Sequence, residues 1–176
     1  MKKADRIKKE AELTMNKIRV ITRHIRNVQD NCLLLGEKLI TAGEIDLGKQ
    51  LIANGFIHDV SKFDGIEFQF MAPGTPTAEE NAKLKLKLAV QQHNSVNKHH
   101  PEAWCGGIKN MPDVFLCEMI ADWKARSEEF GTSLRDWIDG TATTRWNFNK
   151  DDEVYKRIMK FVNLLCEKPF EEITQT

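Results

Sequence analysis

The sequence predicts an all-α protein, a helical bundle of about six or seven helices. Apolar residues recur three and four positions apart in several stretches, the spacing of a helix face, as at Ile18, Ile21, Ile25 and Val28. One stretch, Lys83 to Leu88, alternates like a strand, but no other stretch offers it a partner. With 176 residues and no internal repeat, the chain is predicted to form a single domain over 1–176.

Composition excludes several classes of protein. Lys and Arg number 26, as do Asp and Glu, so no net charge attracts the chain to nucleic acid or to an anionic membrane. No apolar run approaches the roughly 20 residues of a membrane span, and the charged N-terminus lacks the core of a signal peptide. The four cysteines form no Cys-x-x-Cys pair, which predicts free thiols and a cytoplasmic protein.

The first helix is predicted from Lys17, and residues 1–16, rich in Lys and Glu, either extend it or fray. His24 shares an apolar face of this helix.

Residues 43–46 predict a break, with Asp46 as the N-cap of a second helix that ends near His58. Adjacent residues on a helix point about 100° apart. To serve one site, His58 and Asp59 therefore need two metals, a bridging carboxylate or an unwound backbone.

The middle of the chain is predicted to hold one long helix between two loops. Residues 63–76 are rich in Gly and Pro and are expected to be mostly irregular. A capping box at Thr77 indicates the start of the helix, and it is given more weight than the strand-like alternation of residues 83–88. Pro101 stops the helix after His100. His93 and His100 would then face the same way, ~10 Å apart along the axis, which suits two metals and not one.

The C-terminal part is predicted to contain three further helices. After a loop over 101–111, Pro112 and Asp113 open a helix on which Asp122 lies in an apolar stripe and needs a partner. Glu118, one turn earlier, is either a surface residue or an acceptor that orients a metal-bound histidine. A short helix follows between Gly131 and Gly140, then a polar loop over 141–150. The last helix runs from Asp151 to near Pro169.

Three aromatic residues of this region admit two interpretations. They either stack a nucleotide base or pack on the core, and core packing is the favoured interpretation for Trp137, Trp146 and Phe148.

All five histidines belong to one ordered set with two aspartates. The set is His24, His58, Asp59, His93, His99, His100 and Asp122. Imidazole nitrogens and carboxylates together suit borderline divalent metals such as iron, manganese, cobalt or zinc. With Lys62 three residues after Asp59, this order resembles the HD-domain superfamily of metal-dependent phosphohydrolases, in particular its two-metal branch.

Three passages carry the resemblance, which spans Val20 to Ser127. They are His58 to Lys62, His99 to Gly107, and Ala121 to Ala125. The Gly-Tyr-Pro triplet that names the cyclic-dinucleotide phosphodiesterases of this branch is absent, which argues against that substrate.

The resemblance implies one or two divalent transition-metal ions and a metal-bound hydroxide that attacks a small phosphorylated substrate, a nucleotide or related phosphoester. One ion would be held by His24, His58, Asp59 and Asp122, and the second by His93, His99 and His100 with Asp59 bridging. Whether His99 or His100 is a ligand stays open. Lys62 would contact the phosphate, with Lys124 and Arg126 as weaker candidates. Glu67, or an unligated His99 or His100, is a candidate acid for the leaving group.

Two alternatives to the hydrolase remain at the level of sequence. The same scaffold hosts di-iron oxygenases, whose ligand sets overlap with this one. A non-catalytic helical module with a structural metal, or with none, is the third interpretation. The native metal and the oligomeric state stay open at this level.

Overall fold

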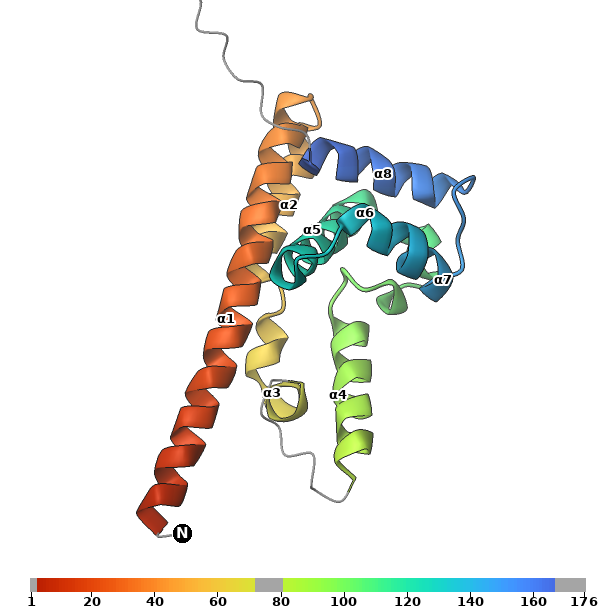
Figure 1. Ribbon diagram of the computed structural model, residues 1–176. Helices are drawn as coiled ribbons and strands as arrows, with labels where there is room; N and C mark the ends of the chain where they lie inside the picture. Colours follow the sequence, from red (N-terminus) through yellow and green to blue (C-terminus); the bar gives the residue numbers. More distant parts are fainter. Residues whose placement is uncertain (1–2, 72–80, 167–176) are drawn as a thin grey trace, which may run out of the picture.

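The computed structural model describes residues 3–71 and 81–166 as helices and short connections, with no strand among them (Figure 1). The α-helices are α1 (Lys3–Thr41), α2 (Ile45–Ile57), α3 (Gly65–Phe70), α4 (Ala82–Val96), α5 (Asp113–Phe130), α6 (Leu134–Trp137), α7 (Thr143–Arg145) and α8 (Glu153–Cys166). The π-helical turn η4 (Ile138–Ala142) joins α6 to α7 without a break. The described residues therefore form seven α-helical runs, and the predicted all-α class is confirmed.

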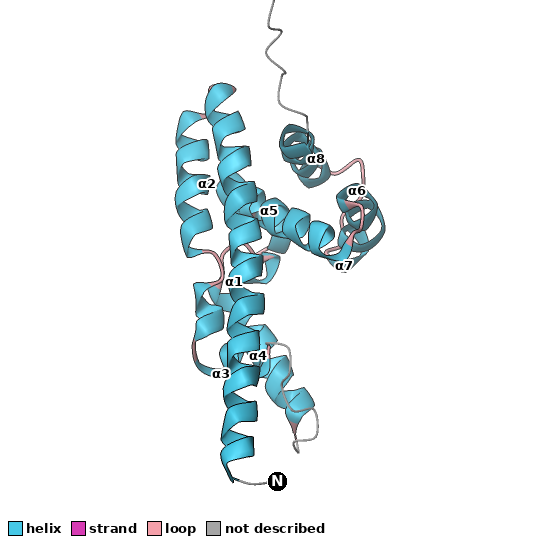
Figure 2. Cartoon of the chain, turned by 60° about the vertical axis from the view of Figure 1, so that its left-hand side comes forward, coloured by secondary structure: helices cyan, strands magenta, loops and turns pink. Residues whose placement is uncertain are grey.

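Helix α1 is the long axis of the molecule, and residues 4–16 extend it at its exposed end. Helix α2 returns beside its other half after a short turn at Gly43 (Figure 2). The two backbones approach closely because glycines lie between them. A β-carbon on Gly36 would lie 2.5 Å from Ile52, and one on Gly55 would lie 2.7 Å from Cys32. Side chains at these positions would separate the two helices.

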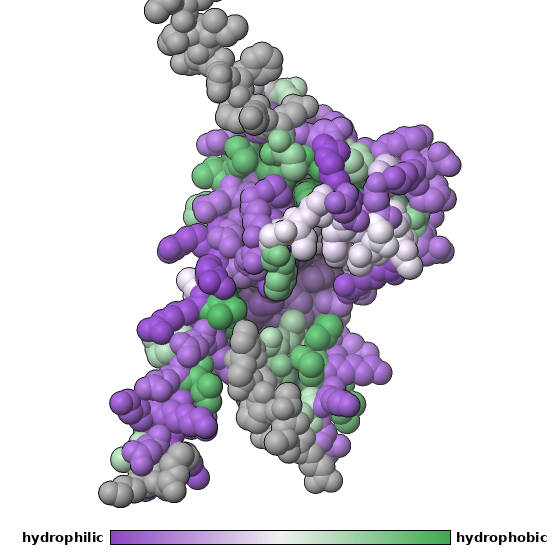
Figure 3. Space-filling model, in the orientation of Figure 1, coloured by the Kyte–Doolittle hydropathy of each residue, from purple (hydrophilic) through white to green (hydrophobic). Residues whose placement is uncertain are grey.

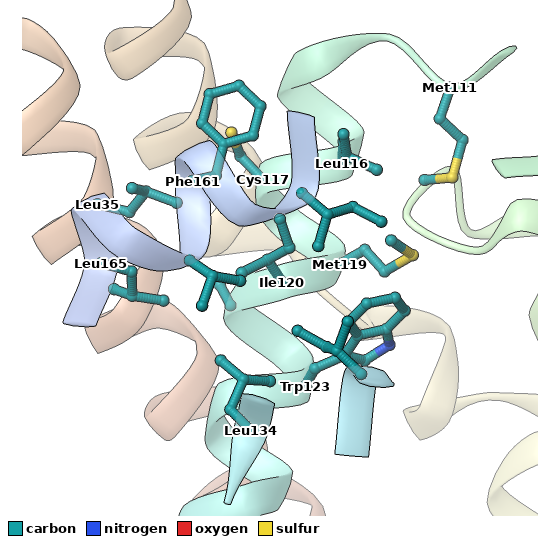
Figure 4. Close-up of a cluster of buried hydrophobic side chains, with 14 of the residues drawn as sticks. Leu35, Met111, Leu116, Cys117, Met119, Ile120, Trp123, Leu134, Phe161 and Leu165 are labelled. Atoms are coloured by element: carbon teal, nitrogen blue, oxygen red, sulfur yellow. The ribbon is translucent and has the colours of Figure 1, made fainter. Parts of the chain in front are cut away.

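The hydrophobic core lies where α5 crosses α1 and α8 covers both. Leu116 and Ile120 of α5 belong to one cluster with Leu35 of α1 and Phe161 of α8 (Figure 4). Burying a side chain of this size stabilises the fold by roughly 1.5–3 kcal/mol. The core holds α1 and α5 in a fixed relation, and both helices carry residues of the site described below.

The structure shows that three predictions about individual segments are wrong. Asp46 is not the N-cap of α2, because Glu44 occupies that position. Gly43, directly before Glu44, has a positive φ and makes the turn that ends α1. Residues 65–70 are helical and not irregular, since the side chain of Asp64 accepts a hydrogen bond from the Gly65 N–H and caps α3. Residues 141–145, predicted as a loop, continue the helix of Trp137 through η4 and α7.

Two loops flank the fourth helix. Helix α4 confirms the helical prediction for residues 83–88, and Thr77 and Pro169 lie outside the described residues. Residues 101–111 form two 3₁₀ turns, η2 (Pro101–Ala103) and η3 (Gly107–Asn110), within the predicted loop.

The four cysteines are free thiols, as predicted. Phe148 is buried in the core, and Trp137 and Trp146 are half-buried against it. Among the described helices, none is both long and apolar enough to span a membrane.

Candidate metal centre

His58 and Asp59 leave α2 through two non-helical residues. His58 is extended (φ −52°, ψ 129°), and Asp59 is left-handed (φ 54°, ψ 19°). The left-handed conformation costs most L residues about 1–2 kcal/mol, although Asp and Asn adopt it more readily than others. The kink brings Nε2 of His58 to 3.3 Å from Oδ2 of Asp59. Of the alternatives left open by the sequence, the structure therefore shows an unwound backbone.

Asp59 lies at the centre of the histidines and is 1% exposed. Its Oδ1 lies 3.3 Å from Nε2 of His93 and 3.4 Å from Nε2 of His99. Its Oδ2 lies 3.3 Å from Nε2 of His58 and 3.9 Å from Nε2 of His24. The two oxygens of one carboxylate thus face two separate pairs of imidazoles.

Asp122 and His100 complete the cluster. Oδ1 of Asp122 lies 3.0 Å from Nε2 of His24, on the Oδ2 side of the centre. The His100 ring centroid lies 4.2 Å from that of His99 and 4.7 Å from that of His93. The expectation that His93 and His100 share one unbroken helix is wrong. Helix α4 ends before His100, and the turn after it folds His100 back toward the cluster.

Four of the histidines direct Nδ1 outward to a carboxylate. The N–O distances are 3.0 Å for His24 with Glu129, 3.0 Å for His58 with Glu118, 3.3 Å for His99 with Glu118, and 2.8 Å for His93 with Glu67. A carboxylate acceptor places the ring proton on Nδ1, so the lone pair of Nε2 points into the centre. Metal-binding histidines in proteins are oriented in this way.

Buried polar atoms that make no well-aligned hydrogen bond gather at the centre, even where an ion-pair partner such as Asp122 for His24 lies close. Those of the described residues are Nε2 of His24, His58, His99 and His100, Oδ1 of Asp59 and Oδ1 of Asp122. Such atoms are rare in folded proteins because leaving a buried polar group unpaired costs about 1–3 kcal/mol. Ligand atoms of His24, His58 and Asp59 lie within 4.8 Å of one another, as do those of Asp59, His93, His99 and His100. The residues therefore fit divalent metal ions.

The charge of the cluster favours cations. Five carboxylates against two cationic side chains leave an excess of three negative charges when the histidines are neutral: Asp59, Glu67, Glu118, Asp122 and Glu129 against Lys62 and Arg126. In the metal-free chain, protons offset part of this charge. Burial lowers the pKa of His58, but Asp59 and Glu118 outweigh burial and raise that pKa to about 10. A bound cation would replace such protons.

His100 differs from the other histidines. Burial lowers its pKa, and the neighbouring His99 and His93 lower it further, to about 3. Its imidazole is therefore neutral at physiological pH and keeps a lone pair available for a metal.

The structure places the other predicted site residues at varying distance from the centre. Lys62, 12% exposed, donates to Oδ2 of Asp59. Glu67 is buried behind His93. Arg126 lies at the surface and pairs with Glu129 at 3.2 Å. Lys124 pairs with Glu128, one turn further along α5.

Sequence reasoning missed Glu129 and left the role of Glu118 open. Glu118 lies four residues before Asp122 and Glu129 seven after it, so all three share one face of α5. That spacing was the available signal. It was not decisive, because acidic residues on a helix face are usually solvated.

Three pockets border the cluster among the described residues. One, of about 300 Å³, borders His100 and Asp122, and a second, of about 130 Å³, borders His24 and Lys62. A third, of about 290 Å³, borders His58 and His99 from the other side. Arg126 lines the first two. In Figure 3 the face between α1, α4 and α6 is hollowed and lined mainly by hydrophilic residues. The cluster is thus buried yet accessible to a small molecule.

Comparison with known proteins gives one finding. Residues 14–168 match the model of a family of unknown function, DUF5662. No curated protein and no solved structure matches the chain. The matched range includes every residue of the cluster.

Proposed function

This chain belongs to the DUF5662 family of unknown function, and we propose that it is an HD-type phosphohydrolase that uses two divalent metal ions to hydrolyse a nucleotide or related phosphoester. One observation carries the proposal. The two oxygens of Asp59 face two pairs of imidazole nitrogens, and those of His24, His58 and His99 have no hydrogen-bond partner. A carboxylate that bridges two cations would be arranged in this way. A structural site for one ion would need only about four ligands.

The proposed ligands divide at Asp59. His24, His58 and Asp122 would hold one ion together with Asp59, and His93, His99 and His100 would hold the other, also with Asp59. Unpaired Nε2 atoms on both His99 and His100 support both of them as ligands. Such ions would supply a nucleophile, by lowering the pKa of a bound water molecule, and would offset the negative charge of a phosphate.

The remaining residues orient ligands and substrate. Glu118 and Glu129 fix the rings of His58, His99 and His24 through Nδ1. Lys62 neutralises Asp59 in the free protein and is placed to contact a phosphate oxygen. Glu67 already accepts hydrogen bonds from Ser61 and Gln92 beside His93. We therefore assign Glu67 to positioning His93 in place of the leaving-group acid.

Metal quantification followed by a substrate screen tests the proposal. Chain purified without chelator should contain about two transition-metal ions. Loaded with manganese, iron or cobalt, it should release phosphate from members of a nucleotide and phosphoester panel. His58→Ala should abolish release, while Asp46→Ala, an exposed residue at the other end of α2, should leave it unchanged. Full metal loading without turnover across the panel would contradict the hydrolase.

Iron chemistry is the alternative that the same experiment separates. A mixed imidazole and carboxylate ligand set also suits iron. A di-iron oxygenase would consume O₂ in a substrate-dependent way with iron alone. Equal activity with redox-inert zinc would exclude it. Fewer than one ion per chain would favour the third interpretation, a non-catalytic helical module.

A further inference from the structure

We propose that the aromatic pocket that borders His100 and Asp122 binds the base of a nucleoside monophosphate, with the phosphate directed toward the ligand cluster. The placement of the phosphate rests on the proposed function, whereas the base site is inferred from other residues. These are the aromatic side chains of Trp137, Trp146 and Phe130, which line the pocket together with Asp122 and His100. An apolar wall thus adjoins the candidate ligands within one cavity.

The indole rings of the pocket are held in place by one another. Trp123 of α5 stacks on Trp146 with centroids 5.3 Å apart and planes at 18°. Trp137 meets both rings edge-on, at 4.8 Å and 6.2 Å. Trp137 and Trp146 are only half-buried, and Phe130 at the rim is 73% exposed. Core packing explains their inner faces, whereas a planar ligand would cover the surface that remains open.

Arg126 connects the aromatic pocket to the smaller one. It lines both pockets, and its side chain is 46% exposed. Its guanidinium pairs with Glu129, which in turn contacts His24. A planar guanidinium binds phosphate oxygens through two parallel hydrogen bonds. Arg126 is therefore placed to contact the phosphate of a ligand whose base lies among the tryptophans.

The size and charge of the two pockets favour a single nucleotide with one phosphate. The aromatic pocket, about 300 Å³, is at the lower end for small-molecule sites, a size that suits one nucleotide. The cationic side chains among the described lining residues are Lys62, Arg126 and Arg145. Arg145 already pairs with Glu102 at 3.5 Å and lies over the ring of Trp146. Further phosphates would meet mainly the carboxylates of the cluster.

Binding to the EDTA-treated chain tests this inference without interference from hydrolysis. Tryptophan fluorescence and calorimetry would compare adenosine, cytidine, their 5′-monophosphates and ribose 5-phosphate. Nucleosides and nucleotides should bind and change the fluorescence, and ribose 5-phosphate should do so far more weakly. Trp137→Leu should weaken binding of nucleosides and nucleotides on the order of tenfold to a hundredfold. Arg126→Gln should weaken nucleotides about tenfold and leave nucleosides unchanged.

Trp104→Phe is the matched control, because Trp104 packs against Phe115 outside the pocket. Circular dichroism checks the fold of Trp137→Leu, and the exposed Arg126 provides a variant with little risk of unfolding. No binding of nucleosides or nucleotides, or equal binding of ribose 5-phosphate and nucleotides, overturns the inference even if other phosphoesters are hydrolysed. So does a folded Trp137→Leu with unchanged affinity. Nucleotide binding without hydrolysis by any metal-loaded form supports the inference and overturns the proposed function.

Discussion

Asp59 combines two features that rarely meet in one residue, a left-handed backbone and full burial of a carboxylate. Burial by itself would raise its pKa, but His58 and Lys62 hold the pKa well below its usual range. The strained conformation persists because the contacts around the side chain determine it. Substitution of Asp59 is therefore the most direct test of whether one carboxylate serves both groups of histidines.

Asp59→Asn should lower the metal content from about two ions per chain to below one, measured by elemental analysis. The amide keeps the size of the carboxyl and tolerates the left-handed backbone, so the fold should survive. Asp122→Asn removes a group that faces His24 alone, and should release one ion only. Unchanged metal content in Asp59→Asn would show that its carboxylate does not bridge.

Glu118 should tune the centre without touching a metal. It accepts from Nδ1 of both His58 and His99 and from Asn54. Burial would raise its pKa, but the two histidines outweigh burial and lower the pKa to about 2. Glu118→Gln should weaken metal affinity about 10- to 100-fold in a competition titration. Glu128→Gln, an exposed change on the same helix, is the control. Equal loss in both variants would point to a general effect on α5.

At the scale of elements, the close contact of α1 and α2 decides where His58 emerges. A β-carbon on Gly48 would lie 2.5 Å from the carbonyl oxygen of Gly36 and 2.7 Å from Ile40. The first neighbour is backbone and cannot turn aside. The glycines therefore hold α2 against α1 at the distance that places His58 opposite His24.

Gly48→Ala should destabilise the protein by about 1–3 kcal/mol, because overpacking outweighs the gain of up to ~1 kcal/mol in helix propensity. Urea unfolding followed by circular dichroism measures the change. Gly140→Ala is the matched control, since a β-carbon on Gly140 would meet nothing within 4 Å and stability should be equal or slightly higher. An unchanged free energy of unfolding in Gly48→Ala would mean that α1 and α2 can move apart at no cost.

Helix ends were harder to predict than helix interiors. The periodicity of α1 and α8 and the opening of α5 at Asp113 were readable from spacing and caps. The end of α4 was not, because Pro101 sets only the latest point at which that helix must stop. The structure ends it at Val96, where the Asn97 side chain donates to the carbonyl of His93. That early end folds His100 toward the centre.

At the scale of the whole molecule, the cluster ties together segments that are distant in the chain. α1 contributes His24, the end of α2 contributes His58 and Asp59, α4 contributes His93 and α5 contributes Asp122. Ions bound at this junction would stabilise the native state alone, since the unfolded chain lacks the site. Thermal unfolding measured by calorimetry would also test the prediction of a single domain over 1–176.

Removal of metal should lower the melting temperature. An ion present at a hundred times its dissociation constant adds about 2.7 kcal/mol, which corresponds to roughly 5–10 °C for a chain of this length. Calorimetry of the chain with manganese and with EDTA measures the shift, and one cooperative transition is expected for a single domain. Asp59→Asn should show no such shift, and a wild-type melting temperature that EDTA leaves unchanged would contradict a metal at the junction.

The helical class and the four free cysteines followed from periodicity and composition, which are local properties of the chain. The set of histidines and aspartates that meet was expected from its resemblance to the ligand order of a known superfamily. How these residues are arranged became known only from the folded chain. The two faces of Asp59, the outward contacts of Glu118 and Glu129 and the tryptophan pocket beside Asp122 all depend on helix crossings. Such crossings result from packing between distant segments, which no local pattern specifies.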